Sequence, residues 1–174
     1  DTHDLTLSDL QMKLANELAS TGKPIILVLN EGRPRIYSKI DDKVAATVLA
    51  YLPGNFGGDA LADIFFGDVN PSGKLPYTYP RMVHSLINYW HKYSEEQVKD
   101  EGMYNYESDY SPMYEFGHGL SYTTFKYSDL KLSKKEITAD ENLTVSVTVT
   151  NTGIREGKEA VLLYSQLVGS TLKL

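Results

Sequence analysis

The pattern of hydrophobic and polar positions predicts an α/β layer in the first half of the chain. Ser8 followed by Gln11 forms a capping-box pattern, and Gly22 supplies a C-terminal stop. Between them, apolar side chains recur at helical spacing, namely Leu10, Leu14 and Leu18. The continuous apolar run at residues 25–29 is typical of a strand buried on both faces, as in a parallel sheet. A helix followed by a buried strand predicts an α/β fold with a mostly parallel sheet.

The next elements repeat this pattern once and then give way to loops. Residues 44–52 form a second apolar segment that fits either a helix or a strand, and residues 59–66 predict a short helix opened by Gly57 and Gly58. The density of proline and glycine at residues 67–80 predicts turns and a short edge strand.

Aromatic residues are concentrated in the middle of the chain. Ten of the 13 tyrosines fall between Tyr77 and Tyr127, and the single tryptophan, Trp90, lies among them. Residues 84–112 are polar and aromatic with no sustained periodicity. A segment of this length without structure of its own is typical of a lid or of an arm that wraps another surface.

After residue 122 the pattern predicts only β-structure. The alternation of apolar and polar residues at 143–150 gives a strand with one apolar and one polar face, and residues 126–132 and 159–168 predict two more strands. A complete immunoglobulin-like sandwich needs about seven strands and about 100 residues. The second domain is therefore expected to be partial, with an exposed apolar face that is a site of association.

Composition excludes several classes of function. The formal charge is −6, and Lys134 and Lys135 form the only cluster of basic residues, so nucleic acid is not an expected partner. The absence of cysteine excludes disulfides, a thiolate zinc site and cysteine catalysis. The apolar runs are too short for membrane insertion. A chain that starts at Asp1 without a leader is expected to be a processed or excised piece.

Four motifs, in order along the chain, carry a resemblance to a known family. They occupy residues 22–34, 53–63, 67–76 and 116–123. Together they resemble the C-terminal half of family 3 glycoside hydrolases, most of all the bacterial β-glucosidase branch. The resemblance covers essentially the whole chain and implies a parent enzyme with an N-terminal (β/α)8 barrel, then an α/β sandwich, then a fibronectin type III-like domain.

The resemblance implies a domain organisation and a set of partners. Residues 1–83 would be the C-terminal part of the α/β sandwich, residues 84–122 an aromatic-rich arm and interdomain connection, and residues 123–174 the N-terminal part of a truncated fibronectin type III-like domain. The implied partners are the barrel portion and a β-linked gluco-oligosaccharide substrate, with no cofactor. Family habit places the parent in the periplasm or outside the cell.

The chemistry of the family implies that the isolated chain is inactive. Retaining hydrolysis needs two carboxyl groups about 5 to 5.5 Å apart, one as nucleophile and one as acid/base. In the family the nucleophile is an Asp of the barrel, and the acid/base is a Glu a few residues upstream of the stretch matched by residues 4–7. We therefore expect no catalytic residue in this chain. The alternative is a stand-alone carbohydrate-binding or interaction module with a finished, monomeric fold.

Aromatic residues of the arm are the candidates for substrate contact, because aromatic faces stack on pyranose rings. The candidates are Trp90, Tyr89, Tyr93, Tyr104 and Tyr106. The competing interpretation is structural packing, which we favour for Tyr104, Tyr106, Tyr110 and Tyr114.

The remaining candidates have simpler structural interpretations. Three carboxylates near the start of the chain fit helix-cap and solvent-face positions, namely Asp4, Asp9 and Glu17. Arg33 could reach a ligand, but a structural ion pair is favoured, and Gly57 with Gly58 fits a tight turn better than an anion site. No metal is expected, because three of the histidines, His84, His91 and His118, are not spaced as metal ligands usually are.

Overall fold

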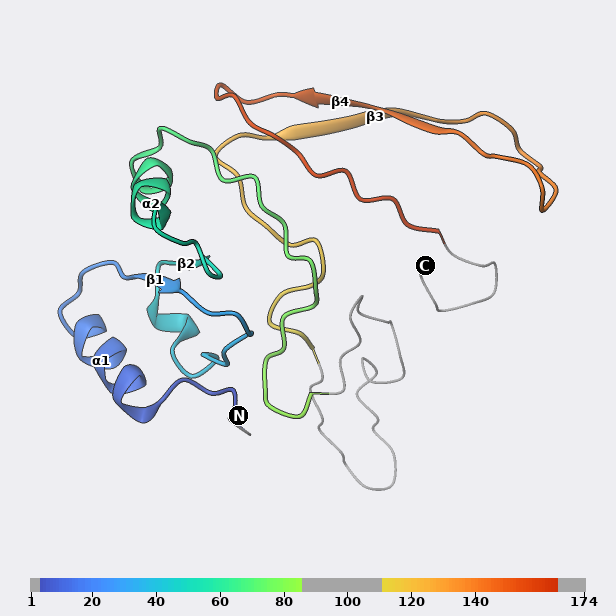
Figure 1. Ribbon diagram of the computed structural model, residues 1–174. Helices are drawn as coiled ribbons and strands as arrows, with labels where there is room; N and C mark the ends of the chain where they lie inside the picture. Colours follow the sequence, from blue (N-terminus) through green and yellow to red (C-terminus); the bar gives the residue numbers. More distant parts are fainter. Residues whose placement is uncertain (1–3, 86–110, 166–174) are drawn as a thin grey trace. The chain divides into compact units, whose positions relative to one another are not determined.

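The computed structural model describes residues 4–85 and 111–165 (Figure 1). These residues form two compact units. The first unit comprises Asp1–Ala60, Lys74–His118 and Leu162–Leu174, and the second comprises Leu61–Gly73 and Gly119–Val161. Each unit thus combines segments that are distant in the sequence.

The first unit begins with helix α1, Asp9–Ala19, which confirms the predicted capping box. The Ser8 side chain accepts a hydrogen bond from the backbone N–H of Gln11 at 3.3 Å, and the Gln11 side chain accepts one from the Ser8 N–H at 3.0 Å. The helix buries Met12 and Ala15. The three leucines of the predicted helical repeat lie on the exposed side instead, with Leu10 80% exposed.

Replacing Ser8 with alanine is expected to destabilise the first unit by about 1 kcal/mol, because one N-terminal N–H of α1 loses its acceptor. Urea unfolding followed by far-UV circular dichroism measures the change. Lys13→Ala on the exposed side of the same helix is the matched control. Equal unfolding midpoints for Ser8→Ala and the control would contradict the role assigned to the cap.

A parallel pair of strands follows the helix. Strand β1, Ile26–Leu29, pairs in parallel with β2, Ala46–Leu49, so the ambiguous segment at residues 44–52 contains a strand, preceded by the 3₁₀ helix η1, Asp41–Lys43. The expectation that β1 is buried on both faces is wrong, because Ile26 is 49% exposed. Leu29 is buried, and Val28, on the same side of β1 as Ile26, is also exposed. In the described chain only one face of this sheet is covered.

The core of the first unit joins the helix, the sheet and two later segments. The buried residues of the core come from α1 and the segment before it, from β1, from the loop before η1, and from two later segments. They are Leu7, Met12, Ala15, Leu29, Tyr37, Ile40, Tyr79 and Met113. Tyr37 and Tyr79 are 1% and 2% exposed. Two tyrosines therefore lie in the core among six aliphatic and methionine side chains.

Helix α2, Gly57–Phe66, confirms the predicted short helix. A Cβ atom on Gly57 would lie 2.6 Å from the Pro53 ring, which supports the interpretation of this glycine as part of a tight turn. Residues 67–80 form no strand, and the expected edge strand is reduced to one antiparallel bridge between Tyr79 and Tyr114. The many prolines lack the N–H groups that a longer ladder requires.

The second unit contains a two-stranded antiparallel ribbon of β3, Phe125–Leu132, and β4, Val145–Asn151 (Figure 1). Tyr127 faces Val149 and Leu132 faces Val145, although Tyr127 and Leu132 are an odd number of residues apart. A bulge between Ser128 and Lys131 inserts the extra residue that shifts the alternation. Tyr127, Leu132 and the alternating valines of β4 thus share one face of the ribbon.

The third strand predicted after residue 122 is not present in the described chain. Residues 159–165 are irregular, which corrects the expected strand at 159–168 as far as residue 165. A strand forms only where its backbone N–H and C=O groups hydrogen-bond to a neighbouring strand. Among the described residues, β3 and β4 pair with each other and with no third strand. An apolar sequence alone does not supply these hydrogen bonds.

Candidate functional site

An ion pair lies just beyond the carboxyl end of β1, the edge at which α/β sheets place binding residues. Glu31 Oε2 lies 3.4 Å from Arg35 Nε, and about a fifth of each side chain is exposed, 21% and 23% respectively. Burial raises the pKa of Glu31, and the guanidinium of Arg35 acts in the opposite direction. The cost of burying the Glu31 carboxylate therefore outweighs its attraction to the guanidinium, so the pair is not a strong source of stability.

Arg35 connects this edge to the segment that precedes α1. Its Nη2 donates a hydrogen bond to the carbonyl of Thr6 at 2.9 Å. Next to it, Ile36 N donates to the carbonyl of Leu5 at 2.9 Å, and Leu7 N donates to the carbonyl of Ile36 at 3.0 Å. The approach to α1 is therefore held by a parallel bridge and by one arginine side chain.

A buried cluster of tyrosines lies behind Arg35. The hydroxyl of Tyr79 donates to the carbonyl of Arg35 at 2.7 Å and accepts from the N–H of Arg35 at 3.0 Å. The Tyr79 ring packs edge-on against Tyr37 and Tyr114 and stacks on Tyr77. Tyr37 donates a hydrogen bond to the hydroxyl of Tyr114 at 3.2 Å. The cluster fixes the backbone of Arg35 and joins segments about 80 residues apart.

Burial keeps the cluster tyrosines protonated. It raises the pKa of Tyr77 to about 12, and it raises the pKa of Tyr37 and Tyr79 further still. Neutral hydroxyls suit a structural hydrogen-bond network.

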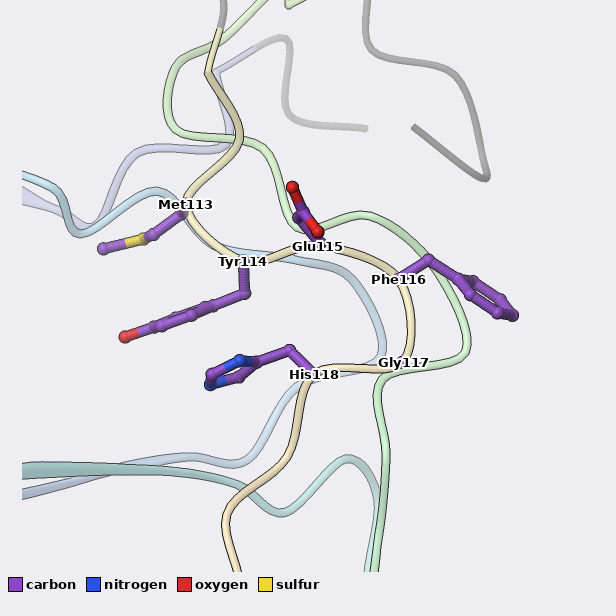
Figure 2. Close-up of a pocket in the computed structure, with 6 residues that line it drawn as sticks. All are labelled: Met113, Tyr114, Glu115, Phe116, Gly117 and His118. Carbon is purple, nitrogen blue, oxygen red and sulfur yellow. The ribbon is translucent and has the colours of Figure 1, made fainter. Parts of the chain in front are cut away.

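A shallow surface depression is lined by six consecutive residues, 113–118 (Figure 2). The rings of Tyr114 and His118 are stacked, with centroids 4.8 Å apart, and Figure 2 shows Phe116 pointing away from them. A Cβ on Gly117 would lie 2.3 Å from Leu162 Cδ1, and this glycine has φ +82°. The depression is open to solvent, so it offers no dry cavity for chemistry on a sugar.

The second unit is organised around Asn70. Its Nδ2 donates to the carbonyl of Pro71 and to Ser121 Oγ, each at 3.1 Å. Its Oδ1 accepts from the N–H of Tyr122 at 2.7 Å and from Ser121 Oγ at 3.1 Å. One amide thus joins the loop after α2 to the segment that precedes β3.

None of the residues predicted to contact substrate lies among the described residues. Trp90, Tyr89 and Tyr93 lie outside the described residues, as do three of the tyrosines interpreted as packing residues, Tyr104, Tyr106 and Tyr110. Tyr114 is described, and it packs against Tyr79 and His118, as the structural interpretation expected for it.

The predicted carboxylates take structural positions near α1. Asp4 accepts a hydrogen bond from the N–H of Thr6 at 2.7 Å. Hydrogen bonds from the side chain and the backbone of Thr6 lower the pKa of the Asp4 carboxyl. The helix cap itself is Ser8, and Asp9 and Glu17 lie within α1, with Asp9 in its first turn. In the described residues, no three His, Asp or Glu side chains lie close enough to hold a metal ion.

Sequence reasoning missed Arg35, Tyr37, Tyr79 and Asn70. Arg35, two residues after Arg33, forms an ion pair with Glu31, and the ion pair expected for Arg33 stays a prediction. The only local signal was the spacing of Glu31 and Arg35, which is i,i+4 in the sequence but follows a strand. The contacts of the other three residues join distant segments, so no sequence window contains both partners.

The chain belongs to a family of glycoside-cleaving enzymes, because the family model described as the glycosyl hydrolase family 3 C-terminal domain matches residues 1–122.

Relatives of known name are consistent with that assignment. The chain is 41% identical to the periplasmic β-glucosidase of Salmonella typhimurium over 97% of this chain and 23% of that protein. It is 42% identical to the lysosomal β-glucosidase of Dictyostelium discoideum over 94% of this chain and 20% of that protein. The chain therefore spans about a fifth to a quarter of the length of these relatives.

Solved structures share the fold. A β-glucosidase from Erythrobacter marinus matches 90% of this chain with a TM-score of 0.77 and 41% identity, over 20% of that chain. β-Glucosidase 3B from Thermotoga neapolitana, solved with glycerol, matches 90% of this chain with a TM-score of 0.66 and 34% identity, over 23% of that chain. The described first unit is a partial α/β domain of this family.

No helix among the described residues has the length and apolar character needed to cross a membrane.

Proposed function

We propose that this chain is part of a retaining, exo-acting β-glycosidase that releases terminal β-linked glucose in carbohydrate breakdown. The observation that carries the proposal is the family 3 match over residues 1–122, in a chain that spans about a fifth of β-glucosidases related to it. The nucleophile belongs to the N-terminal (β/α)8 barrel, and the acid/base belongs to residues that precede residues 4–7. The isolated chain is inactive.

Uncovered apolar surface in the first unit supports an N-terminal partner. Leu10 and Leu14 are 80% and 60% exposed on α1, and Ile26 is exposed on β1. Two parallel strands rarely form a stable sheet alone, and parallel sheets are normally covered on both faces. The N-terminal portion of the same enzyme is the partner that would cover these positions.

The ribbon of β3 and β4 supports a fibronectin type III-like domain that begins within residues 123–174. The ribbon carries Tyr127 and Leu132, 45% and 54% exposed, on the same face as the alternating valines of β4. A sandwich buries one apolar face of each sheet against a second sheet. Residues 1–83 then form the end of the α/β sandwich domain, and residues 84–122 form the connection.

The substrate is a β-linked gluco-oligosaccharide, and Trp90, Tyr89 and Tyr93 are the proposed contacts from this chain. The Salmonella relative is named as periplasmic, which favours a periplasmic or extracellular parent.

Hydrolysis of p-nitrophenyl β-glucoside tests the proposal. The chain alone is expected to release no p-nitrophenol, whereas the chain mixed with a separately expressed N-terminal portion is expected to be active. The Leu14→Glu variant of the chain is expected to lower the activity of the mixture, because a charge replaces an apolar contact. Glu17→Gln on the same helix is the control. Activity of the chain alone would overturn the proposal, and sugar binding by an inactive monomer would favour the stand-alone binding module.

A further inference from the structure

We infer that Asn142 is an N-glycosylation site, at which an oligosaccharide is transferred from a lipid diphosphate to the side-chain amide. Asn142, Leu143 and Thr144 form the one Asn-X-Ser/Thr sequence of the chain in which X is not proline. A sequence of this kind is an acceptor when it lies on a surface loop of an exported protein. The inference rests on the proposed function, which places the parent enzyme in the periplasm or outside the cell.

The structure places Asn142 on an exposed loop. The residue lies between β3 and β4, in an irregular stretch that ends where β4 begins at Val145. Its side chain forms no hydrogen bond with another described residue, so the amide nitrogen is not engaged. Leu143 and Thr144 are exposed as well. The whole acceptor sequence is therefore accessible to a transferase.

The other two asparagines of the second unit lack the acceptor sequence, and their amides are engaged. Asn70 is followed by a proline, which prevents recognition, and its amide takes part in four hydrogen bonds. Asn151 Nδ2 donates to the carbonyl of Arg155 at 2.7 Å, and the residue two positions after Asn151 is a glycine. Asn142 thus combines the acceptor sequence with an amide that has no structural task.

Neighbouring contacts fix the chain on both sides of Asn142. Before it, the carboxylate of Glu141 forms an ion pair with Lys134. After it, the carbonyl of Thr144 accepts a hydrogen bond from the N–H of Ser133 at 2.9 Å, which extends the pairing of the ribbon by one residue beyond β4. These anchors hold the acceptor at the end of the ribbon, where a bulky glycan meets solvent.

The acceptor sequence adjoins the polar face of the ribbon. Thr144 directly precedes Val145, and successive side chains of a paired strand point to opposite faces. Thr144 therefore shares a face with Ser146 and Thr148, opposite the alternating valines of β4. A glycan beside this polar face leaves the apolar face free to pack against a second sheet.

The sequence around Asn142 suits two types of transferase. Asp140 lies two positions before Asn142 and is exposed. Bacterial oligosaccharyltransferases require an acidic side chain at that position, whereas the eukaryotic enzymes do not. Both types catalyse the same transfer. Asn142 Nδ2 loses a proton and bonds to the anomeric carbon of the oligosaccharide, the bond from that carbon to the lipid diphosphate breaks, and the lipid diphosphate leaves without any oxidation or reduction.

Mass spectrometry of the natural protein tests the inference. The parent enzyme is purified from the cells that produce it and digested with trypsin, which releases residues 136–155 as one peptide that contains both Asn142 and Asn151. We expect this peptide to carry the added mass of one glycan, which fragmentation locates on Asn142. Asn151 is the matched control within the same peptide and is expected to be unmodified. Recovery of this peptide only in its unmodified form would overturn the inference.

Two variants produced in the same cells test how the site is recognised. Thr144→Val keeps the shape of the side chain but removes its hydroxyl, so it is expected to abolish the glycan on Asn142. Modification that persists in Thr144→Val would contradict sequence-directed glycosylation. Asp140→Asn identifies the type of transferase. Loss of the glycan indicates the bacterial type and retention indicates the eukaryotic type, and either result supports the inference.

Hydrolysis of p-nitrophenyl β-glucoside by the same preparation separates this inference from the proposed function. An active enzyme with an unmodified Asn142 would overturn the inference alone. A glycosylated enzyme without activity would overturn the proposed function alone.

Discussion

Raising the pH from about 9 to about 12 is expected to unfold the first unit, because its core contains tyrosines that cannot ionise in place. Tyr37 and Tyr79 are 1% and 2% exposed, and burial raises the pKa of both hydroxyls well above the ordinary value. Burial also raises the pKa of Tyr77, which stacks on Tyr79, to about 12.

The direction of the effect follows from proton binding. Above pH about 10 the unfolded chain releases its tyrosine protons, whereas the folded chain keeps them on Tyr37 and Tyr79. The folded state then binds more protons, so the free energy of unfolding falls as the pH rises. Each of the two tyrosines contributes a slope of about 1.4 kcal/mol per pH unit. The stabilisation is complete below pH about 10 and disappears as the pH passes the folded pKa values.

Urea midpoints measured between pH about 8 and 11.5, with tyrosinate absorbance recorded in parallel, test this expectation. Tyr79→Phe is the matched control, since it removes one titrating hydroxyl and is expected to reduce the slope by about 1.4 kcal/mol per pH unit. At neutral pH the same variant loses both hydrogen bonds to the Arg35 backbone and is expected to be about 1 to 2 kcal/mol less stable. A midpoint independent of pH up to 11.5 would contradict the argument.

Local patterns predicted the elements that depend on neighbouring residues. The cap of α1 lies within four residues of sequence, and the alternation along β4 follows from its own side chains. These features could be predicted because the interaction and the pattern occupy the same window. The four family motifs likewise indicated the class of enzyme that the family match then established.

Long-range contacts explain what the sequence could not show. The helical repeat of leucines predicted the correct helix, but its buried residues are Met12 and Ala15. Packing against the other segments of the core determines which face of α1 is buried. Burial of both faces of β1 was expected from its apolar composition. Composition does not show which segment, if any in this chain, packs on each face. Partners of Arg35 lie at Thr6 and Tyr79, and neither is near it in sequence.

The same limit applies to the functional site. Under the proposed function the catalytic groups belong to other parts of the parent enzyme, so no motif for them was expected in this chain. The described residues that join distant segments are the tyrosines behind Arg35. Structural residues of this kind are identified by their contacts and carry no motif.

Replacing Asn70 with alanine is expected to give the largest loss of stability in the second unit, about 2 to 3 kcal/mol. Four hydrogen bonds are removed, and the N–H of Tyr122 and the hydroxyl of Ser121 lose an acceptor. A Cβ added to Gly157 would lie 2.7 Å from Asn70 Nδ2, so the amide is also closely packed and its removal leaves a void.

Thermal unfolding of Asn70→Ala beside Asn142→Ala measures this effect, because Asn142 is an exposed asparagine of the same unit. The control is expected to change the unfolding free energy by less than about 0.5 kcal/mol. Asn70→Asp keeps the acceptor oxygen but loses the donor, so it is expected to fall between the control and Asn70→Ala. If Asn70→Ala and Asn142→Ala were equally stable, the loop after α2 and the segment before β3 would have to be joined by other contacts, such as the hydrogen bond from the hydroxyl of Tyr122 to the carbonyl of Ile64.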